Sequence, residues 1–323
     1  MVGNLVTFCN FFSDGIEAMD LQNGLFTRFV DIEQGKLVDH TITLGARVDS
    51  IYEYKNRFIL TKFLRYFLKQ FLLLQGKDAR SLKMYLDSID AMSKHLFRLS
   101  QPSNLLYVQE LIGDSPENKM VPEDRSFLVS FDQDHLVCFL PGLLALGAEY
   151  MEVSIRIKHM ELSERLMKTC MEFYLRSKTG LAPEIVRFVD GIDFENDGGS
   201  LHNILRPETI ESLFILWRKT HDLQYRKWAY TIFQSFKKYC RLPKKGYASL
   251  GNVDDVSTAD ENLASSNWRD HMESFFLAET MKYFYLIFAD DSLIPLDKYV
   301  LNTEAHPLAI DLDTSFRVKS KKT

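Results

Sequence analysis

Two carboxylates at helical spacing form the chemically most suggestive stretch of the sequence. Glu208 and Glu211 lie three residues apart in the run LRPETIESLF, directly after Pro207. Proline is favoured at the start of a helix because its missing N–H would have no partner there, so the run predicts a helix N-terminus. Carboxylates can bind a hard divalent cation or accept hydrogen bonds from hydroxyl groups, but acidic residues in a first turn also stabilise the helix dipole. The run alone leaves these interpretations open.

The same helix has a clearly apolar face. This face is formed at helical spacing by Ile210, Leu213, Phe214 and Trp217. At about 100° per residue, Glu208 lies roughly 160° from that face. The pattern therefore predicts a helix that packs on one side and presents Glu208 on the other.

Glu279 stands in an unusually apolar segment. It lies within one turn of Phe275, Phe276 and Tyr283. An unpaired carboxylate buried there would cost several kcal/mol. The side chain therefore either reaches solvent at a helix end or meets a cation or hydroxyl groups, and the sequence does not choose between these.

Further acids occur at predicted helix positions. Asp49 and Glu53 lie four residues apart, where like charges share one helix face and repel, and Arg47 can offset this in part. Glu184 follows Pro183 at another predicted helix start.

Five separate blocks give these acids a common context. They lie in order between Asn23 and Pro307, and together they resemble the class I α-1,2-mannosidases of glycoside hydrolase family 47, closest to the endoplasmic-reticulum branch. The blocks are residues 45–54 (GARVDSIYEY), 134–142 (DHLVCFLPG), 205–214 (LRPETIESLF), 272–280 (MESFFLAET) and 302–307 (NTEAHP).

The resemblance implies an all-α fold, an (α/α)7 barrel that here lacks its N-terminal helices. Apolar stripes from Leu82 to Leu96, from Leu162 to Phe173, from Trp228 to Tyr239 and over 272–288 independently predict successive antiparallel helices. The polar stretch 246–267 predicts a loop. We expect residues 1–22 to be an N-terminal segment outside the family pattern, 23–310 a partial catalytic domain and 311–323 a polar tail.

The resemblance also implies a site for calcium-dependent, inverting hydrolysis of α-1,2-linked mannose. Glu208 matches the family's general base, and Asp49 matches a carboxylate that takes part in protonation. Thr303 matches the direct calcium ligand, through its side-chain and main-chain oxygens, while neighbouring acids hold coordinating waters. The substrate-binding positions correspond to Arg47, Glu53, Asp134, His135, Glu184, Arg206, Glu211, Phe275, Glu279 and Glu304. In isolation, a histidine such as His135 is more often a core or surface residue.

The chain departs from the family pattern in three places. The glutamate usually assigned as general acid lies upstream of anything that this sequence matches. Residues 55–66 separate Glu53-Tyr54 from Phe67-Leu68-Lys69-Gln70, which normally follow almost at once, and residues 121–133 form a second insertion. Since about 3.6 residues make one helical turn, either insertion could shift the helix phase.

Composition constrains the partners. A net charge of −5 gives no reason to expect nucleic acid, and 46% hydrophobic with 26% charged residues is ordinary for a globular protein. No membrane anchor or convincing signal peptide is visible, and the apolar run 58–74 contains Lys62, Arg65 and Lys69, so we expect it to form a buried or amphipathic helix. The resemblance implies a Cys138–Cys170 disulfide, high-mannose N-glycans on glycoproteins as substrates and a location in the endoplasmic reticulum or Golgi lumen.

Two other functions stay open on the sequence. A non-catalytic relative could bind glycans or a protein partner, and an unrelated helical scaffold would leave the acids scattered. Convergence of Glu208, Glu279 and Glu304 in space distinguishes the scaffold from the other two.

Overall fold

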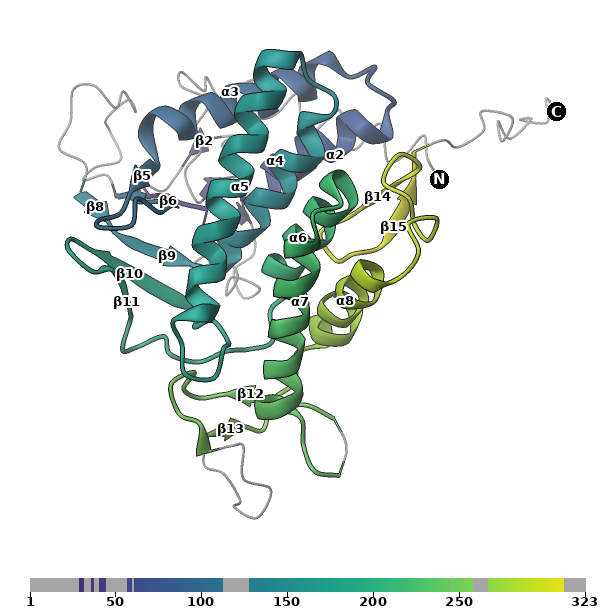
Figure 1. The fold of residues 1–323 in the computed structure, drawn as a ribbon. Helices are drawn as coiled ribbons and strands as arrows, with labels where there is room; N and C mark the ends of the chain where they lie inside the picture. Colours follow the sequence, from purple (N-terminus) through teal and green to yellow (C-terminus); the bar gives the residue numbers. More distant parts are fainter. Residues whose placement is uncertain are drawn as a thin grey trace.

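The computed structural model describes residues 29–31, 36–37, 41–44, 57–59, 61–112, 128–244, 246–257 and 267–310. Helices dominate this part of the chain (Figure 1). They are α2 (Thr61–Leu73), α3 (Ala79–His95), α4 (Leu140–Ala148), α5 (Val153–Leu175), α6 (Glu208–Thr220), α7 (Leu223–Ser235) and α8 (Met281–Phe288). Three short helical segments join them: η1 (His135–Phe139), η2 (Phe236–Cys240) and η4 (Phe276–Thr280), of which the last two are π-helical.

The centre of the fold is the contact between α4 and α6. Every residue of α4 is buried, as its sequence LPGLLALGA suggests, and the helix packs against α5 and α6. Gly142 allows the close approach, because a Cβ atom there would lie 2.8 Å from the Cα atom of Ser212. The Ser212 hydroxyl joins the two elements by donating to the Cys138 carbonyl at 2.5 Å and accepting from the Gly142 N–H at 2.9 Å.

Helix α6 differs from the amphipathic helix that its sequence predicts. All residues from Glu208 to Trp217 are buried, so the face that carries Glu208 does not meet solvent. The apolar face packs on α4, α7 and α8, while the acidic face meets polar side chains from other elements. The helix starts at Glu208, one residue later than expected, with Pro207 as its N-cap.

The flanking helices follow the predicted stripes. Helices α3, α5 and α7 each bury one face, and α3 and α7 begin at N-caps whose side chains accept backbone N–H groups, Asp78 from Ser81 and Asp222 from Gln224. Helix α2 spans most of the apolar run 58–74 and buries Phe67 and Leu68 completely. Among the described residues, no helix is long and apolar enough to cross a membrane.

Short antiparallel strands connect the helices, and the sequence did not predict most of them. Three-stranded sheets are formed by β1 (Phe29–Asp31), β2 (Lys36–Leu37) and β4 (Arg57–Ile59); by β3 (Thr41–Ile42), β7 (Glu110–Ile112) and β8 (Leu128–Ser130); and by β9 (Asp132–Asp134), β10 (Ile185–Val189) and β11 (Asp193–Asn196). Two-stranded pairs are β5 (Phe97–Leu99) with β6 (Leu106–Val108), β12 (Ser249–Leu250) with β13 (Trp268–Arg269), and β14 (Tyr299–Leu301) with β15 (Pro307–Ala309). Strand β12 lies inside the stretch 246–267, for which a loop was predicted.

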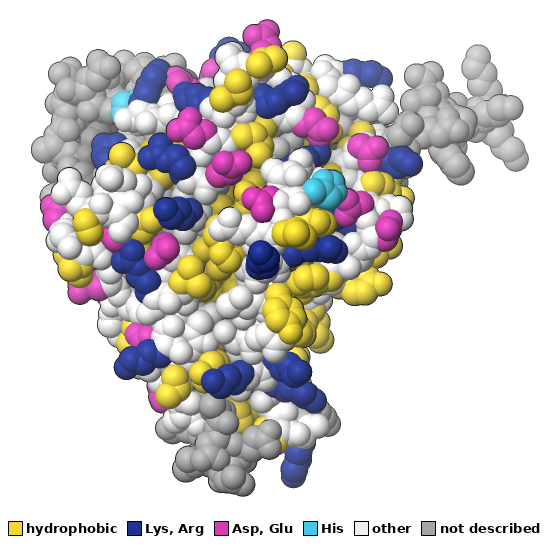
Figure 2. All heavy atoms as spheres, in the orientation of Figure 1, with side chains coloured by type: hydrophobic (Ala, Val, Ile, Leu, Met, Phe, Trp, Pro, Cys, Tyr) yellow, Lys and Arg dark blue, Asp and Glu magenta, His cyan; other side chains and the backbone are white. Residues whose placement is uncertain are grey.

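Two of these strand pairs position polar residues beside α6. In the β9–β10 ladder Asp134 pairs with Ile185, which places the end of β9 next to Glu184. The β14–β15 hairpin contacts α2 and lies beside α8 (Figure 1). On the molecular face seen in Figure 2, basic and acidic side chains are interspersed with apolar ones.

Candidate active site

A buried histidine–carboxylate pair joins η1 to α6. The Nδ1 atom of His135 lies 3.2 Å from Oε2 of Glu208, and both side chains are almost completely buried. On its other side, His135 Nε2 lies 2.6 Å from the Tyr174 hydroxyl of α5 and 3.0 Å from the Thr209 hydroxyl. The imidazole therefore bridges the carboxylate and two hydroxyl groups.

These contacts favour the His135 tautomer with the proton on Nδ1. Burial raises the pKa of Tyr174, so its phenol stays protonated and can donate to Nε2. The Nδ1–H group is then free to donate to Glu208. Burial alone would raise the pKa of Glu208, but the hydrogen bond from His135 and the positive charge of Arg206 hold it below its usual value. Glu208 is therefore ionised at neutral pH.

Glu211, one turn further along α6, is neutralised by two cations of α2. Its carboxylate oxygens lie 3.2 Å from Arg65 Nη1 and 3.4 Å from Lys69 Nζ, and all three side chains are buried. The Arg65 guanidinium also lies 3.9 Å from the centre of the Phe139 ring. Thus α2 faces the acidic side of α6.

Glu184 and Arg206 form a third ionic contact. Arg206 Nε lies 2.6 Å from Glu184 Oε2, and the guanidinium lies 5.9 Å from the centre of the Phe275 ring. The main chain fixes both residues, because the Glu184 carbonyl accepts the His135 N–H at 2.8 Å and Leu205, beside Arg206, has a φ of 67°. A positive φ is unfavourable for leucine and indicates local backbone strain next to the acids.

Glu279 is affected electrostatically by acids from distant parts of the sequence. Burial raises its pKa to about 8, and the negative charges of Glu208, Glu211 and Glu304 contribute further. Glu279 lies in the π-helical segment η4, an irregular geometry that is frequent at functional sites. These electrostatic contributions indicate that the other three carboxylates lie near Glu279, which favours a common site over acids scattered on separate surfaces.

The turn of the β14–β15 hairpin carries Thr303 and Glu304. Asn302 shapes this turn, because its side-chain oxygen accepts the N–H groups of Glu304 at 2.9 Å and His306 at 2.8 Å. Lys282 of α8 donates to the Ala305 carbonyl at 2.8 Å and ties the hairpin to the helix. Thr303 is half-buried, whereas Glu304 is exposed.

Known proteins resemble this chain in sequence and in fold. Residues 10–310 match the domain described as glycosyl hydrolase family 47. The chain belongs to this family. It is 41% identical over 297 residues to the human endoplasmic reticulum mannosyl-oligosaccharide 1,2-alpha-mannosidase, covering 90% of this chain and 37% of the relative. It is 39% identical over 312 residues to the Candida albicans mannosyl-oligosaccharide 1,2-alpha-mannosidase, covering 90% and 51%.

A solved family 47 structure shares the fold. The chain superposes on an α-1,2-mannosidase from Trichoderma reesei with a TM-score of 0.71 and 25% identity, over 90% of this chain and 57% of that one. This likeness confirms the expected all-α fold of the α/α-barrel type. The chain thus spans between about a third and a little over half of the length of these relatives.

The other predicted site residues divide into two groups. Asp134 is buried at the end of β9, beside His135. Arg47, Asp49 and Glu53 lie outside the described residues, and their family 47 roles stay predictions. The proposed domain boundaries and the two insertions are likewise untested, although 55–66 contains the start of α2 and 121–133 contains β8.

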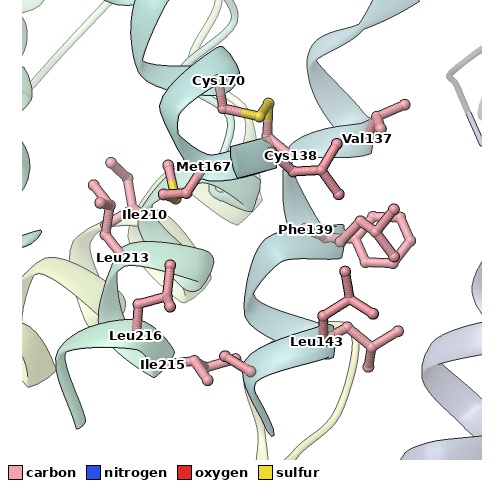
Figure 3. Close-up of a cluster of buried hydrophobic side chains, with 14 of the residues drawn as sticks. Val137, Cys138, Phe139, Leu143, Met167, Cys170, Ile210, Leu213, Ile215 and Leu216 are labelled. Atoms are coloured by element: carbon pink, nitrogen blue, oxygen red, sulfur yellow. A yellow bond between two sulfur atoms is a disulfide. The ribbon is translucent and has the colours of Figure 1, made fainter. Parts of the chain in front are cut away.

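The disulfide expected from the resemblance is present. Cys138 of η1 and Cys170 of α5 are bonded, with their Cα atoms 5.9 Å apart (Figure 3). The bond lies among buried apolar side chains of α4, α5 and α6, including Met167 and Ile210. Cys240 is a buried free thiol whose pKa is raised by burial, so it is poorly reactive.

Sequence reasoning missed four residues of the site. Arg65 and Lys69 were interpreted only as charges that interrupt an apolar run, and Tyr174 and Thr209 were not considered. The helical spacing of Arg65 and Lys69, four residues apart on a face that is otherwise apolar, was an available signal for a buried acidic partner.

Proposed function

We propose that this chain forms part of a family 47 α-1,2-mannosidase that removes terminal α-1,2-linked mannose from high-mannose N-glycans. The relatives named above carry that activity in their names. The observation that carries the proposal is the buried Glu208, ionised by its His135 hydrogen bond, within a cluster of converging carboxylates.

Glu208 is suited to act as the general base. In an inverting reaction, the base takes a proton from water while the water oxygen bonds to the anomeric carbon and the glycosidic C–O bond breaks. The leaving oxygen receives a proton from an acid on the opposite side of the sugar, and the two carboxyl groups lie roughly 6.5–9.5 Å apart. From the resemblance, Asp49 would take part in this protonation through a water molecule. Phe275 would offer an apolar face to the sugar, and Glu184 and Arg206 would bind its hydroxyl groups.

The donor set around Glu279 suits a hard divalent cation. Burial is the main cause of the raised pKa of Glu279, and the negative charges of Glu208, Glu211 and Glu304 add to it, so carboxylate oxygens are available near Glu279 for a hard cation. Among the described residues, no three His, Cys, Asp or Glu side chains are arranged to ligate a metal directly. From the resemblance we propose that the Thr303 hydroxyl and carbonyl oxygens hold a calcium ion, with Glu279 and Glu304 holding its waters. When bound, calcium would orient two mannose hydroxyl groups and balance the acidic charge.

The Cys138–Cys170 disulfide supports a location in an oxidising compartment. Together with the endoplasmic-reticulum names of relatives, it supports the lumen of the endoplasmic reticulum or Golgi as the place of action.

Release of free mannose tests the proposal. The purified chain is incubated with a high-mannose N-glycan and calcium, and proton NMR follows the anomer of the mannose first released. We expect β-mannose from the α-linkage, suppression by a chelator, and a loss of about 10²–10⁴-fold in Glu208→Gln, the range for removal of a general base. Glu195→Gln, an exposed acid of β11, is the matched control and should retain activity.

Binding of the glycan without mannose release would contradict the hydrolase proposal. That outcome would support the non-catalytic glycan-binding function instead. Retained activity in Glu208→Gln would show that another group is the base.

A further inference from the structure

Arg65 brings a positive charge into the carboxylate cluster from an unexpected part of the chain. It lies in the segment 55–66, which the resemblance predicts to be an insertion. Helix α2 nevertheless runs without interruption from Thr61 to Leu73, so this segment supplies the first turns of a helix that continues into Phe67-Leu68-Lys69-Gln70. In the family pattern, the residues that match Glu53 and Tyr54 come almost directly before those that match Phe67. In this chain the two residues directly before Phe67 are Arg65 and Tyr66.

The Arg65 side chain is held firmly among the acids. Its guanidinium contacts Glu211 at 3.2 Å and stacks 3.9 Å from the centre of the Phe139 ring, with only 11% of the side chain exposed. Its charge also acts on Glu208 and Glu279, lowering the pKa of each. Arg65 thus contacts Glu211 directly and acts electrostatically on Glu208 and Glu279.

Lys69 strengthens the effect from the next turn of α2. Its ammonium group lies 3.4 Å from the other oxygen of Glu211 and is buried. Burial lowers the pKa of Lys69, while Glu211 opposes that shift and Arg65 adds to it. Two cations that repel each other are thus kept together by the acidic cluster, since an unpaired buried charge would be costly.

We propose that Arg65, assisted by Lys69, is a built-in counter-cation that balances the carboxylate cluster and weakens its affinity for a divalent cation. The inference rests on the calcium site proposed above and concerns how strongly this chain needs the ion. A fixed positive charge beside the acids repels calcium and supplies part of the charge that calcium would otherwise supply. The cluster should therefore stay folded without metal and bind calcium weakly.

Calcium binding to charge-removing variants tests the inference. The chain is stripped with EDTA and dialysed, and calcium is titrated by calorimetry, with the melting temperature recorded at each concentration. Arg65→Met should bind calcium about tenfold more tightly than the wild type and should show a larger calcium-induced rise in melting temperature. Arg65→Lys keeps the charge and should resemble the wild type.

Two further variants make the result interpretable. Lys69→Met removes the second cation and should also tighten calcium binding, which keeps the test valid if Arg65→Met does not fold. Arg226→Met is the matched control, because Arg226 stacks 4.2 Å from the Trp217 ring and donates to the Ile287 carbonyl. It should lower stability without changing the calcium affinity.

The outcomes separate this inference from the proposed function. Calcium affinities of Arg65→Met and Lys69→Met no higher than that of the wild type would overturn the inference, whether or not the wild type binds calcium. Failure of the hydrolase proposal is observed in a different measurement, the absence of mannose release by a wild-type chain that binds the glycan.

Discussion

The Nδ1 atom of His135 lies 3.2 Å from the Glu208 carboxylate, and its Nε2 atom lies 2.6 Å from the Tyr174 hydroxyl. These three residues come from η1, α6 and α5. The protonation of Glu208 therefore depends on Tyr174 of α5, which contacts His135 and not the carboxylate. Tyr174 thus acts as a positioning residue through His135.

Replacing Tyr174 by phenylalanine should shift the acidic limb of the pH profile. Without the phenol, Nε2 loses its strongest donor, the tautomer with the proton on Nδ1 is less favoured, and the hydrogen bond that lowers the pKa of Glu208 weakens. The pKa of Glu208 should therefore rise, and mannose release should be lost at a higher pH than in the wild type. The measurement is kcat/KM between pH 3.5 and 7.

Tyr85→Phe is the matched control for this variant. Tyr85 is also fully buried, but its hydroxyl has no hydrogen-bond partner among the described residues, so the substitution removes an oxygen without breaking a network that the structure shows. Its acidic limb should coincide with that of the wild type. An unchanged limb in Tyr174→Phe, or an equal shift in Tyr85→Phe, would show that Tyr174 does not act through His135.

The helices of the core were predictable because their signals are local. The apolar stripes of α3, α5 and α7 and the Pro207 start of α6 required only helical spacing. The helical wheel placed Glu208 opposite the apolar face, but it could not show which side chains cover the acidic face. In the fold, that face meets α2 and η1, whose side chains satisfy it.

The site itself could be predicted only from the resemblance. No spacing rule connects Glu208 with Glu279 or Glu304, which are brought together by helix packing and a hairpin turn. Tyr174 and Arg65 act through contacts between residues 39 and more positions apart, and only coordinates show them. The short strands were missed because strands of two to five residues leave little periodic signal.

Glu279 should make the stability of the metal-free chain fall as pH rises. Its folded-state pKa is about 8 against an ordinary value of 4.5, so between these values the folded chain keeps a proton that the unfolded chain releases. Folding stability therefore decreases with pH over this interval. The slope is at most about 1.4 kcal/mol per pH unit for one proton, and less here because the side chain is only half-buried.

Glu279→Gln removes this titration and should flatten the slope. Urea unfolding in EDTA at pH 5, 6, 7 and 8 gives the free energy of unfolding at each pH. The variant should gain stability relative to the wild type as pH increases. Glu161→Gln, an exposed acid of α5, should keep the wild-type slope. Equal slopes for Glu279→Gln and the wild type would mean that Glu279 is ionised throughout this range.

The Cys138–Cys170 disulfide should stabilise both the fold and the His135–Tyr174 contact. It joins η1 to α5 three residues after His135 and four before Tyr174, and it closes a loop with a sequence separation of 32. Loop entropy alone predicts a stabilisation of about 3–4 kcal/mol. The double variant Cys138→Ala, Cys170→Ala should therefore lose stability of this order in urea unfolding.

In the same double variant, His135 should also be positioned less firmly against Glu208. If the bond keeps η1 against α5, its loss should move the acidic limb of mannose release in the direction expected for Tyr174→Phe, at temperatures well below unfolding. Cys240→Ala is the control, because Cys240 is buried but free and lies in η2. It should change stability only through packing and leave the pH profile unchanged. A double variant that is less stable but has a wild-type acidic limb would show that the disulfide stabilises the fold without positioning the base.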